Sequence, residues 1–487
     1  MLRITSAQIN PTIGDITGNI ALMLRSARQA RDEGADLVVF PEMSLTAYYP
    51  GDLLDDTNFQ ARVEAGLLQL QAATRETPNL FWVVGAPVRR SGIGKPFHNA
   101  LLVLKNGELV MQYAKQLLPT YNIFDERRHF EPGPDVARVL RVGDVQIGLM
   151  ICEDGWNDDG QDYSVNPFQR LADAAPDLVV SINASPSNIG KHEQRHTVFT
   201  AACAKHKLPL LYVNQIGGHD QLVYDGASFA VNAQGVVVYE ATRFAEDVTT
   251  LCFDAVKQAF TQGSGADLPV VPEAGLPTME FYRQQIVLGL KDYARRCGFT
   301  QAVVGSSGGI DSALTLVLAA EALGAENVVG ITMPSRFSSE GSVSDSVVLC
   351  RNLGITLIEH PIRTIVSAFE TTYASSFGET LQGLPLENLQ ARVRGTTLME
   401  YSNRFGHLLL TTGNKSEVSV GYCNIVARTS RTSTMVVPAF PTPLRLVVRS
   451  WKPSQSKAVW QAKRVRPKAN VGERWSRHEP RRGCPQP

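Results

Sequence analysis

The stretch that most constrains this 487-residue chain is an eight-residue turn rich in serine and glycine. Its residues are Gly305, Ser306, Ser307, Gly308, Gly309, Ile310, Asp311 and Ser312. The apolar run 302–304 before it predicts a short buried strand, and the apolar run 313–320 after it predicts a helix. A small-residue turn between a strand and a helix N-terminus gathers free backbone N–H groups, an arrangement that binds phosphate. The carboxylate of Asp311 repels phosphate, so we expect Asp311 to hold a magnesium ion, which in turn binds the phosphate.

The composition is typical of a chain with two or three globular domains. Its residues are 44% hydrophobic, and no apolar run approaches the roughly 20 residues of a membrane span. The first eight residues lack the apolar core of a signal peptide. Seven cysteines are scattered without CxxC pairs, which argues against a disulfide framework and a zinc ribbon. We therefore expect a cytoplasmic protein that does not contact a membrane.

Residues 1–260 alternate apolar runs with amphipathic segments, which predicts a layered α/β domain. The expected strands are 2–9, 36–40, 80–86, 100–104, 108–113, 145–151, 178–182 and 210–214, and the expected helices include 20–33 and 59–76. The segment 261–280 is rich in Gly, Pro and Ala and predicts a linker.

Three polar residues follow the ends of predicted strands, where the active sites of α/β domains usually lie. They are Glu42, Lys115 and Cys152. Taken singly, each has an ordinary alternative: a helix cap, a solvated charge and a core residue, respectively. Together they supply a base, a cation that stabilises an oxyanion, and a thiol nucleophile. This set predicts attack on an amide.

The surrounding strings resemble the nitrilase/amidase superfamily, whose triad is Glu-Lys-Cys on an αββα sandwich. They read Phe-Pro-Glu at 40–42, Lys-Gln-Leu-Leu-Pro at 115–119 and Cys-Glu-Asp-Gly-Trp at 152–156, in the family's order and spacing. The resemblance implies that Glu42 is the general base, Lys115 the oxyanion partner and Cys152 the nucleophile. It also implies a second carboxylate near the triad, Glu126, for which pairing with the two following arginines remains an alternative.

Within that superfamily, the chain is most similar to the glutaminase domain of the glutamine-dependent NAD synthetases. Tyr121, Ser185 and Lys191 match the glutamine-binding positions of that family. Hydroxyl and ammonium groups suit the polar carboxylate end of glutamine. Each of the three is alternatively an ordinary surface residue.

The string His-Glu-Gln-Arg-His at 192–196 fits HExxH, the signature of zinc-protease helices. It directly follows Lys191 of the predicted glutamine site, and no clear third ligand follows downstream. We therefore expect no zinc, and no haem or flavin either.

The serine- and glycine-rich turn resembles the pyrophosphate loop of the ATP pyrophosphatases, which split ATP between its α and β phosphates to adenylate a substrate. No Gly-Lys-Ser/Thr follows, so it is not a Walker loop. The predicted strands are 302–304, 327–333 and 356–362. A predicted helix at 279–297 precedes the first strand, and the predicted helices that begin at 313 and 342 separate the strands. This order predicts a parallel, doubly wound sheet with its site at the carboxyl ends of the strands. Met333 ends the second strand, where family members receive adenosine.

Two further strings resemble the NAD synthetases. They read Glu-Asn-Leu-Gln-Ala-Arg-Val-Arg from residue 387, where we expect a helix to begin, and Thr-Thr-Gly-Asn-Lys-Ser-Glu from residue 411. The resemblance maps Asn388 to deamido-NAD, Thr412 to ATP, and Glu417 to deamido-NAD or to magnesium. A helix cap for Asn388 and a surface acid for Glu417 remain alternatives.

The match ends near residue 423. Residues 424–487 hold 14 Lys/Arg and 2 Asp/Glu, although the whole chain holds 47 of each. Three interpretations are open: an out-of-frame translation, a disordered tail, or a basic arm that binds nucleic acid. The last is the least expected of the three. Resequencing that finds the reading frame intact would refute the first. Salt-sensitive DNA binding that is lost on truncation at residue 423 would favour the third.

The sequence thus predicts an α/β protein in four parts. They are an αββα glutaminase domain at 1–260, a linker at 261–280, an incomplete ATP-pyrophosphatase-type synthetase domain at 281–423 and the aberrant tail at 424–487. The predicted function is ATP-dependent amidation of deamido-NAD to NAD with ammonia from glutamine, in a homo-oligomer. The alternatives are a glutaminase with an inactive synthetase domain, another ATP-pyrophosphatase amidotransferase, and a nucleic-acid-binding protein.

Overall fold

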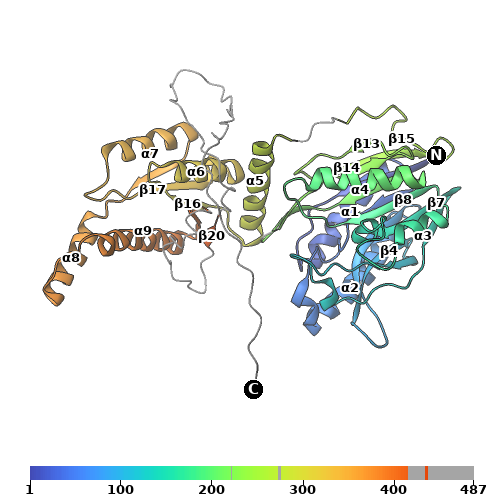
Figure 1. Cartoon of the computed structure of the whole chain (residues 1–487), viewed down its shortest axis with the longest axis horizontal. Helices are drawn as coiled ribbons and strands as arrows, with labels where there is room; N and C mark the ends of the chain where they lie inside the picture. The colour runs from blue at the N-terminus through green and yellow to red at the C-terminus, as the bar shows by residue number, and fades with distance from the viewer. Residues whose placement is uncertain (221, 272–275, 415–433, 437–487) are drawn as a thin grey trace, which may run out of the picture. The chain divides into compact units, whose positions relative to one another are not determined.

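A computed structural model describes residues 1–220, 222–271, 276–414 and 434–436 (Figure 1). The first half of the fold is built on a seven-stranded sheet. The strand order is β15-β14-β1-β2-β3-β4-β5. Their bounds are β1 Leu2–Gln8, β2 Leu37–Val39, β3 Phe81–Arg89, β4 Phe97–Lys105, β5 Glu108–Ala114, β14 Asp247–Asp254 and β15 Ala259–Gln262. β1 lies inside the sheet between β14 and β2, and six of its seven residues are buried although only three of them are apolar.

A six-stranded sheet has the order β13-β12-β9-β8-β7-β6. Its strands are β6 Val139–Val142, β7 Val145–Ile151, β8 Leu178–Asn183, β9 Leu210–Asn214, β12 Phe229–Val231 and β13 Val237–Glu240. A separate hairpin consists of β10 Ile216–His219 and β11 Leu222–Asp225. The three inner strands β7, β8 and β9 pair in parallel, so their carboxyl ends meet at one edge.

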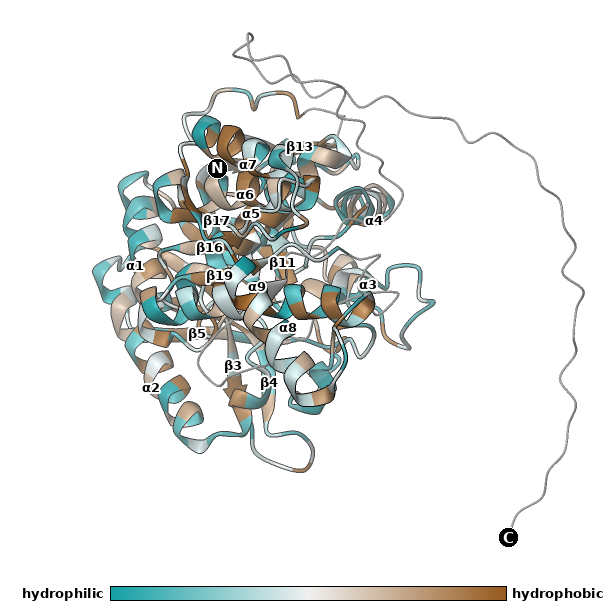
Figure 2. Ribbon diagram, turned by 90° about the vertical axis from the view of Figure 1, so that its left-hand side faces the viewer, coloured by the Kyte–Doolittle hydropathy of each residue, from teal (hydrophilic) through white to brown (hydrophobic). Residues whose placement is uncertain are grey.

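Three apolar clusters hold these elements in four layers. One lies between the seven-stranded sheet and the helices α1 Ile16–Asp32 and α2 Thr57–Ala73. A second lies between the two sheets, and a third lies between the six-stranded sheet and the helices α3 Pro167–Asp173 and α4 Lys191–His206. In Figure 2, α1 and α2 carry hydrophilic residues alternating with hydrophobic ones, as expected of helices with one buried face. The predicted αββα sandwich is confirmed.

The second half is built on a five-stranded sheet of order β18-β17-β16-β19-β20, in which every pairing is parallel. The strands are β16 Ala302–Gly305, β17 Val328–Thr332, β18 Thr356–Glu359, β19 Leu408–Thr411 and β20 Thr434–Val436. The helices are α5 Thr278–Arg296, α6 Ile310–Leu323, α7 Glu340–Leu353, α8 Arg363–Phe377 and α9 Leu384–Phe405. Figure 1 shows α6 and α7 on one side of β16 and β17 and α9 on the other. The predicted doubly wound parallel sheet is confirmed.

Local signals set many of these boundaries. The β4–β5 hairpin turns at Asn106 and Gly107, which both have positive φ, as the Asn-Gly pair predicts. Asp15 caps α1 by accepting from the N–H of Gly18, so the helix begins four residues before the sequence prediction. Strand β15 begins inside the predicted 1–260 domain and ends just inside the predicted linker.

Two elements differ from expectation. Helix α9 begins at Leu384 rather than at Glu387, after a glycine with positive φ at 383. Strand β20 lies in the tail, where no strand periodicity was evident, and pairs in parallel with β19. The other residues of the tail lie outside the described part of the chain, and so do the interpretations that concern them. Among the described helices, none is both long and apolar enough to cross a membrane.

Candidate active sites

A buried ion-pair cluster lies in the first domain. The Lys115 Nζ donates to Glu42 Oε1 at 2.8 Å and to Glu126 Oε1 at 2.6 Å. All three side chains are excluded from solvent. Two of the alternatives are therefore wrong: Lys115 is no solvated charge, and Glu126 pairs with Lys115, whereas the neighbouring Arg128 pairs with Asp52.

Both sheets contribute to this cluster. Lys115 directly follows β5, and Glu42 follows β2, in the seven-stranded sheet. Cys152 directly follows β7 of the six-stranded sheet and starts a short 3₁₀ turn, Cys152–Gly155. Its φ of +43° is uncommon for a residue with a side chain and marks a sharp turn of the backbone at the strand end.

The charges of this cluster act on the thiol. Burial raises the pKa of Cys152 well above its usual value; the anion of Glu42 raises it further and the cation of Lys115 lowers it. Burial alone would lower the pKa of Lys115, but Glu126 and Glu42 together outweigh burial and raise this pKa. The three predicted triad residues are thus close enough to interact electrostatically, and the thiol is protonated at neutral pH.

Several residues that sequence reasoning missed complete the cluster. The amide of Asn99, on β4, donates to Glu42 Oε1 at 2.7 Å and to Glu126 Oε2 at 3.3 Å. The Tyr48 hydroxyl donates to Glu126 Oε1 at 2.8 Å, and the N–H of Ala184 donates to Glu42 Oε2 at 3.0 Å. None of them stands in a recognisable local motif, and their positions depend on strand register and on a loop that returns to the site.

The turn at Cys152 is held in place by the buried acid Asp154. Asp154 accepts from the Tyr113 hydroxyl at 2.7 Å and from the N–H groups of Gln116 and Leu117 at 3.0 and 2.8 Å. These bonds join the turn after β7 to the segment after Lys115. Burial raises the pKa of Asp154 to about 6, although these hydrogen bonds oppose the shift.

The three predicted glutamine-binding residues lie around this turn. The Tyr121 hydroxyl donates to Glu153, with 3.0 Å to its Oε1. Lys191 Nζ lies 3.6 Å from the ring centre of Trp156, and burial lowers its pKa. Ser185 directly follows Ala184, whose N–H contacts Glu42, so the structure brings all three into one neighbourhood.

Ser185 is held by a buried arginine that sequence reasoning also missed. Arg195 Nε donates to the Ser185 hydroxyl at 3.1 Å, and its Nη2 donates to the Ser185 carbonyl at 3.0 Å. The same guanidinium pairs with Asp225 at 2.8 Å, with both side chains buried. The sequence gives no local signal for this pair, which lies 30 residues apart.

In the second domain, the predicted phosphate loop joins β16 to α6. Gly308 has a φ of +77°, and a Cβ there would come 2.4 Å from the Ser342 carbonyl oxygen, so glycine is required. The N–H of Ser307 donates to the Ser312 hydroxyl and that of Gly309 donates to the Ser307 hydroxyl, each at 3.2 Å. Asp311 is exposed in the first turn of α6.

Other predicted nucleotide contacts follow neighbouring strand ends. Met333 directly follows β17 and Thr412 directly follows β19, the two strands that flank β16. Asn388 is the fifth residue of α9 and half-buried, so a helix-cap role for it is wrong. Glu417 lies outside the described residues.

Comparisons with known families match this architecture. The family model "Carbon-nitrogen hydrolase" matches residues 3–255, and the model "NAD synthase" matches residues 282–427.

Three similar proteins carry the same printed description. The glutamine-dependent NAD(+) synthetase of Synechocystis sp. is 42% identical over 434 residues, which is 87% of this chain and 76% of that protein. The one from Thermotoga maritima is 37% identical over 453 residues, covering 87% and 76%. A structure of the Acinetobacter baumannii enzyme in complex with ADP is 36% identical with a TM-score of 0.79, also covering 87% and 76%.

Fold and site together define a nitrilase-type carbon–nitrogen hydrolase domain joined to an NAD synthase domain. More specifically, the chain belongs to the family of glutamine-dependent NAD(+) synthetases, which are glutamine-hydrolysing ligases. It spans 76% of the length of the Synechocystis relative.

The close approach of β3 to the segment that carries Glu42 leads to a prediction. A Cβ on Gly85 would lie 2.2 Å from the Met43 backbone nitrogen and 2.7 Å from the Glu42 carbonyl carbon. We expect Gly85→Ala to displace Glu42, to destabilise the domain by about 1–3 kcal/mol and to lower glutamine hydrolysis. Thermal unfolding and ammonia release measure the two effects.

Gly341→Ala is the matched control, because a Cβ there meets only Ser339 Oγ, at 3.8 Å. It lies in the first turn of α7 and should leave both measurements near the wild-type values. Equal behaviour of the two variants would show that the Glu42 segment tolerates displacement.

Proposed function

We propose that this chain hydrolyses glutamine at Cys152 and uses the ammonia to convert deamido-NAD into NAD at the expense of ATP. The observation that carries the first half is the buried Lys115 held between Glu42 and Glu126 beside the thiol. The observation that carries the second half is the glycine-dependent loop at the N-terminus of α6, with Met333 and Thr412 at adjacent strand ends.

Glutamine hydrolysis begins with a neutral thiol, because burial keeps the pKa of Cys152 high. Glu42 accepts the thiol proton while the sulfur attacks the carboxamide carbon. Lys115 stabilises the negative charge that develops on the carboxamide oxygen. The C–N bond then breaks, and the proton on Glu42 leaves with ammonia. Water activated by Glu42 hydrolyses the resulting thioester to glutamate and restores the thiol.

The polar end of glutamine binds to Tyr121, Ser185 and Lys191 in this proposal. Their positions near Cys152 support it, as does the ammonium of Lys191, which suits the α-carboxylate. Arg195 acts indirectly, since it holds both the hydroxyl and the carbonyl of Ser185.

In the second domain, the loop from Gly305 to Ser312 binds the phosphates of ATP through its backbone N–H groups. The nicotinate carboxylate of deamido-NAD attacks the α-phosphate and releases pyrophosphate. Ammonia then attacks the acyl-adenylate and AMP leaves. Asn388 is proposed to contact deamido-NAD, and Met333 and Thr412 to contact ATP.

Magnesium fits this site through Asp311, whose exposed carboxylate lies in the first turn of α6. When bound, the ion supplies positive charge that neutralises the phosphates. Glu417 is proposed as a second ligand or as a contact to deamido-NAD. The homo-oligomer and the cytoplasmic location also stay predictions.

The two half-reactions should separate in a Cys152→Ala variant. We expect glutamine-dependent NAD formation to fall by at least about 10³-fold, because the nucleophile is gone. NAD formation with added ammonium should persist, because the second domain keeps its groups. Mass-spectrometric detection of NAD from deamido-NAD and ATP, with either nitrogen source, is the measurement.

Asp311→Ala is the complementary variant: it should retain glutaminase activity and lose NAD formation from both nitrogen sources. Cys297→Ala, which removes an exposed cysteine far along the chain from the triad, should retain both activities. Ammonia release without NAD under every condition would instead identify a glutaminase whose second domain is inactive. Pyrophosphate release triggered only by a different acceptor would identify another amidotransferase.

The pH dependence should reveal Glu126. Burial raises the pKa of Glu126 from 4.5 to about 7; the Lys115 cation opposes this rise and the Glu42 anion adds to it. Below that pH the carboxylate gains a proton and its hold on Lys115 weakens, so we expect glutaminase kcat/KM to fall on the acidic side with an apparent pKa near 7. Glu126→Gln should lower the plateau on the order of 10²-fold and remove this inflection.

Stability should follow the opposite trend. The folded protein binds the Glu126 proton more tightly than the unfolded chain does, so the contribution of this group to stability falls as pH rises from 4.5 to about 7.

If the acidic fall of glutaminase kcat/KM is unchanged in Glu126→Gln, the inflection near pH 7 belongs to another group.

A further inference from the structure

The HExxH string acquires a third partner in the fold. His192 and His196 lie on α4, and Glu240 ends β13. His192 Nε2 is 2.8 Å and His196 Nε2 is 3.0 Å from the same oxygen, Glu240 Oε2. Ligand atoms of the three residues all lie within 4.8 Å of one another. The sequence showed no clear third ligand downstream, but the fold brings Glu240, 48 residues from His192, into the cluster as a candidate.

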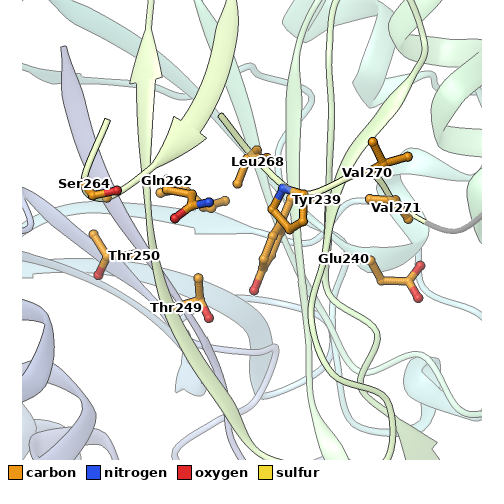
Figure 3. Close-up of a pocket in the computed structure, with 12 residues that line it drawn as sticks. Tyr239, Glu240, Thr249, Thr250, Gln262, Ser264, Leu268, Val270 and Val271 are labelled. Atoms are coloured by element: carbon orange, nitrogen blue, oxygen red, sulfur yellow. The ribbon is translucent and has the colours of Figure 1, made fainter. Parts of the chain in front are cut away.

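Regular secondary structure produces this convergence. The two histidines are four residues apart and so share one face of α4, and their ring centres are 4.3 Å apart. Tyr239 and Glu240 are successive residues of β13 and point to opposite faces. Figure 3 shows the Glu240 carboxylate turned away from the Tyr239 ring in the pocket of about 550 Å³ that both residues line.

The hydrogen bonds in this cluster are incomplete. His192 Nε2 is hydrogen-bonded to Glu240, whereas His196 Nε2, 3.0 Å from the same oxygen, makes no hydrogen bond within the described part of the chain. His196 Nε2 and His192 Nδ1 are buried atoms without a hydrogen-bond partner among the described residues. A buried nitrogen that lacks a partner carries a free-energy cost, and a bound cation would relieve that cost at His196 Nε2.

We propose that His192, His196 and Glu240 form a binding site for Zn²⁺ or a chemically similar divalent ion. Two imidazoles and a carboxylate are a donor set that such ions prefer over magnesium. Ligand atoms about 2.0–2.2 Å from a tetrahedral zinc ion are roughly 3.3–3.5 Å apart, so the two N–O distances need to widen by only a few tenths of an ångström. Binding through Nε2 leaves Nδ1 of His192 as a donor, facing Glu193 Oε1 at 3.8 Å.

The site would join the start of α4 to β13. Because Lys191 precedes His192 directly, an ion here fixes the helix end that presents Lys191 to the turn at Cys152. Three protein ligands leave a fourth position for water. Glu193 is 63% exposed, unlike a buried catalytic base, so the role we assign to the ion is structural.

A second cluster of candidate ligands in the described residues is weaker. Asp52, Asp55 and His129 also lie within the required distances. Their carboxylates are 73% and 63% exposed, and Arg128 pairs with Asp52. That arrangement is an ordinary surface charge network.

Metal titration of the full chain, produced without a polyhistidine tag, tests the proposal. The protein is stripped with a chelator, returned to excess magnesium chloride and titrated with zinc sulfate against a chromophoric competitor. We expect one equivalent of zinc with a Kd of about 1 µM or tighter and a melting temperature raised by about 3 °C or more. Cobalt in place of zinc should give the visible absorption of a low-coordinate nitrogen and oxygen site.

His196→Gln and Glu240→Gln should each weaken binding by about tenfold or more and abolish the cobalt spectrum. Both keep side chains of similar size, and their melting temperatures without metal report whether they fold. His360→Ala, which removes an exposed imidazole outside the cluster, should bind zinc as the wild type does. Zinc binding that is the same in all variants, or wild-type binding no tighter than that of His196→Gln, would overturn the proposal.

Discussion

The arrangement of the first domain depends on one buried cation held between two carboxylates. Desolvating an ammonium and two carboxylates is expensive, and removing one partner of such a group leaves an uncompensated charge in the interior. Lys115, Glu42 and Glu126 therefore have to be fixed together, and Asn99 adds a donor that bridges the two acids. Because the group keeps a net negative charge, an adjacent thiolate is unfavourable, and burial together with Glu42 raises the pKa of the Cys152 thiol.

The packing of the two sheets of the sandwich holds these residues in position. Glu42 and Lys115 follow strands of one sheet and Cys152 follows a strand of the other, so the thiol reaches its partners only when both sheets are packed. The apolar cluster between the sheets is therefore part of the site's construction. Asp154 ties the two sides together by accepting from Tyr113 and from the backbone after Lys115. Its cost in buried charge is compensated by four donors.

The sequence predicted the elements that have local signals. Apolar runs located most strands of the first domain to within a few residues, and motif strings placed the triad and the phosphate loop. It did not reveal Asn99 or Tyr48, because their positions depend on strand register and on a loop that returns to the site. Glu240 was missed for the same reason: it lies 48 residues from His192, and only the position of β13 beneath α4 brings them together. Strand β20 lacks any periodicity and takes its conformation from pairing with β19.

The two sites achieve their preorganisation differently. In the first domain, side chains removed from water hold one another through ion pairs, so the arrangement of the proposed site is fixed without a ligand. In the second, the N–H groups of Ser307 and Gly309 donate to neighbouring serine hydroxyls at 3.2 Å. A phosphate oxygen is a stronger acceptor than a hydroxyl, so it would displace those serines and leave the backbone in place. The proposed nucleotide site would then need side-chain rotation of these serines, whereas Gly308 fixes the backbone turn.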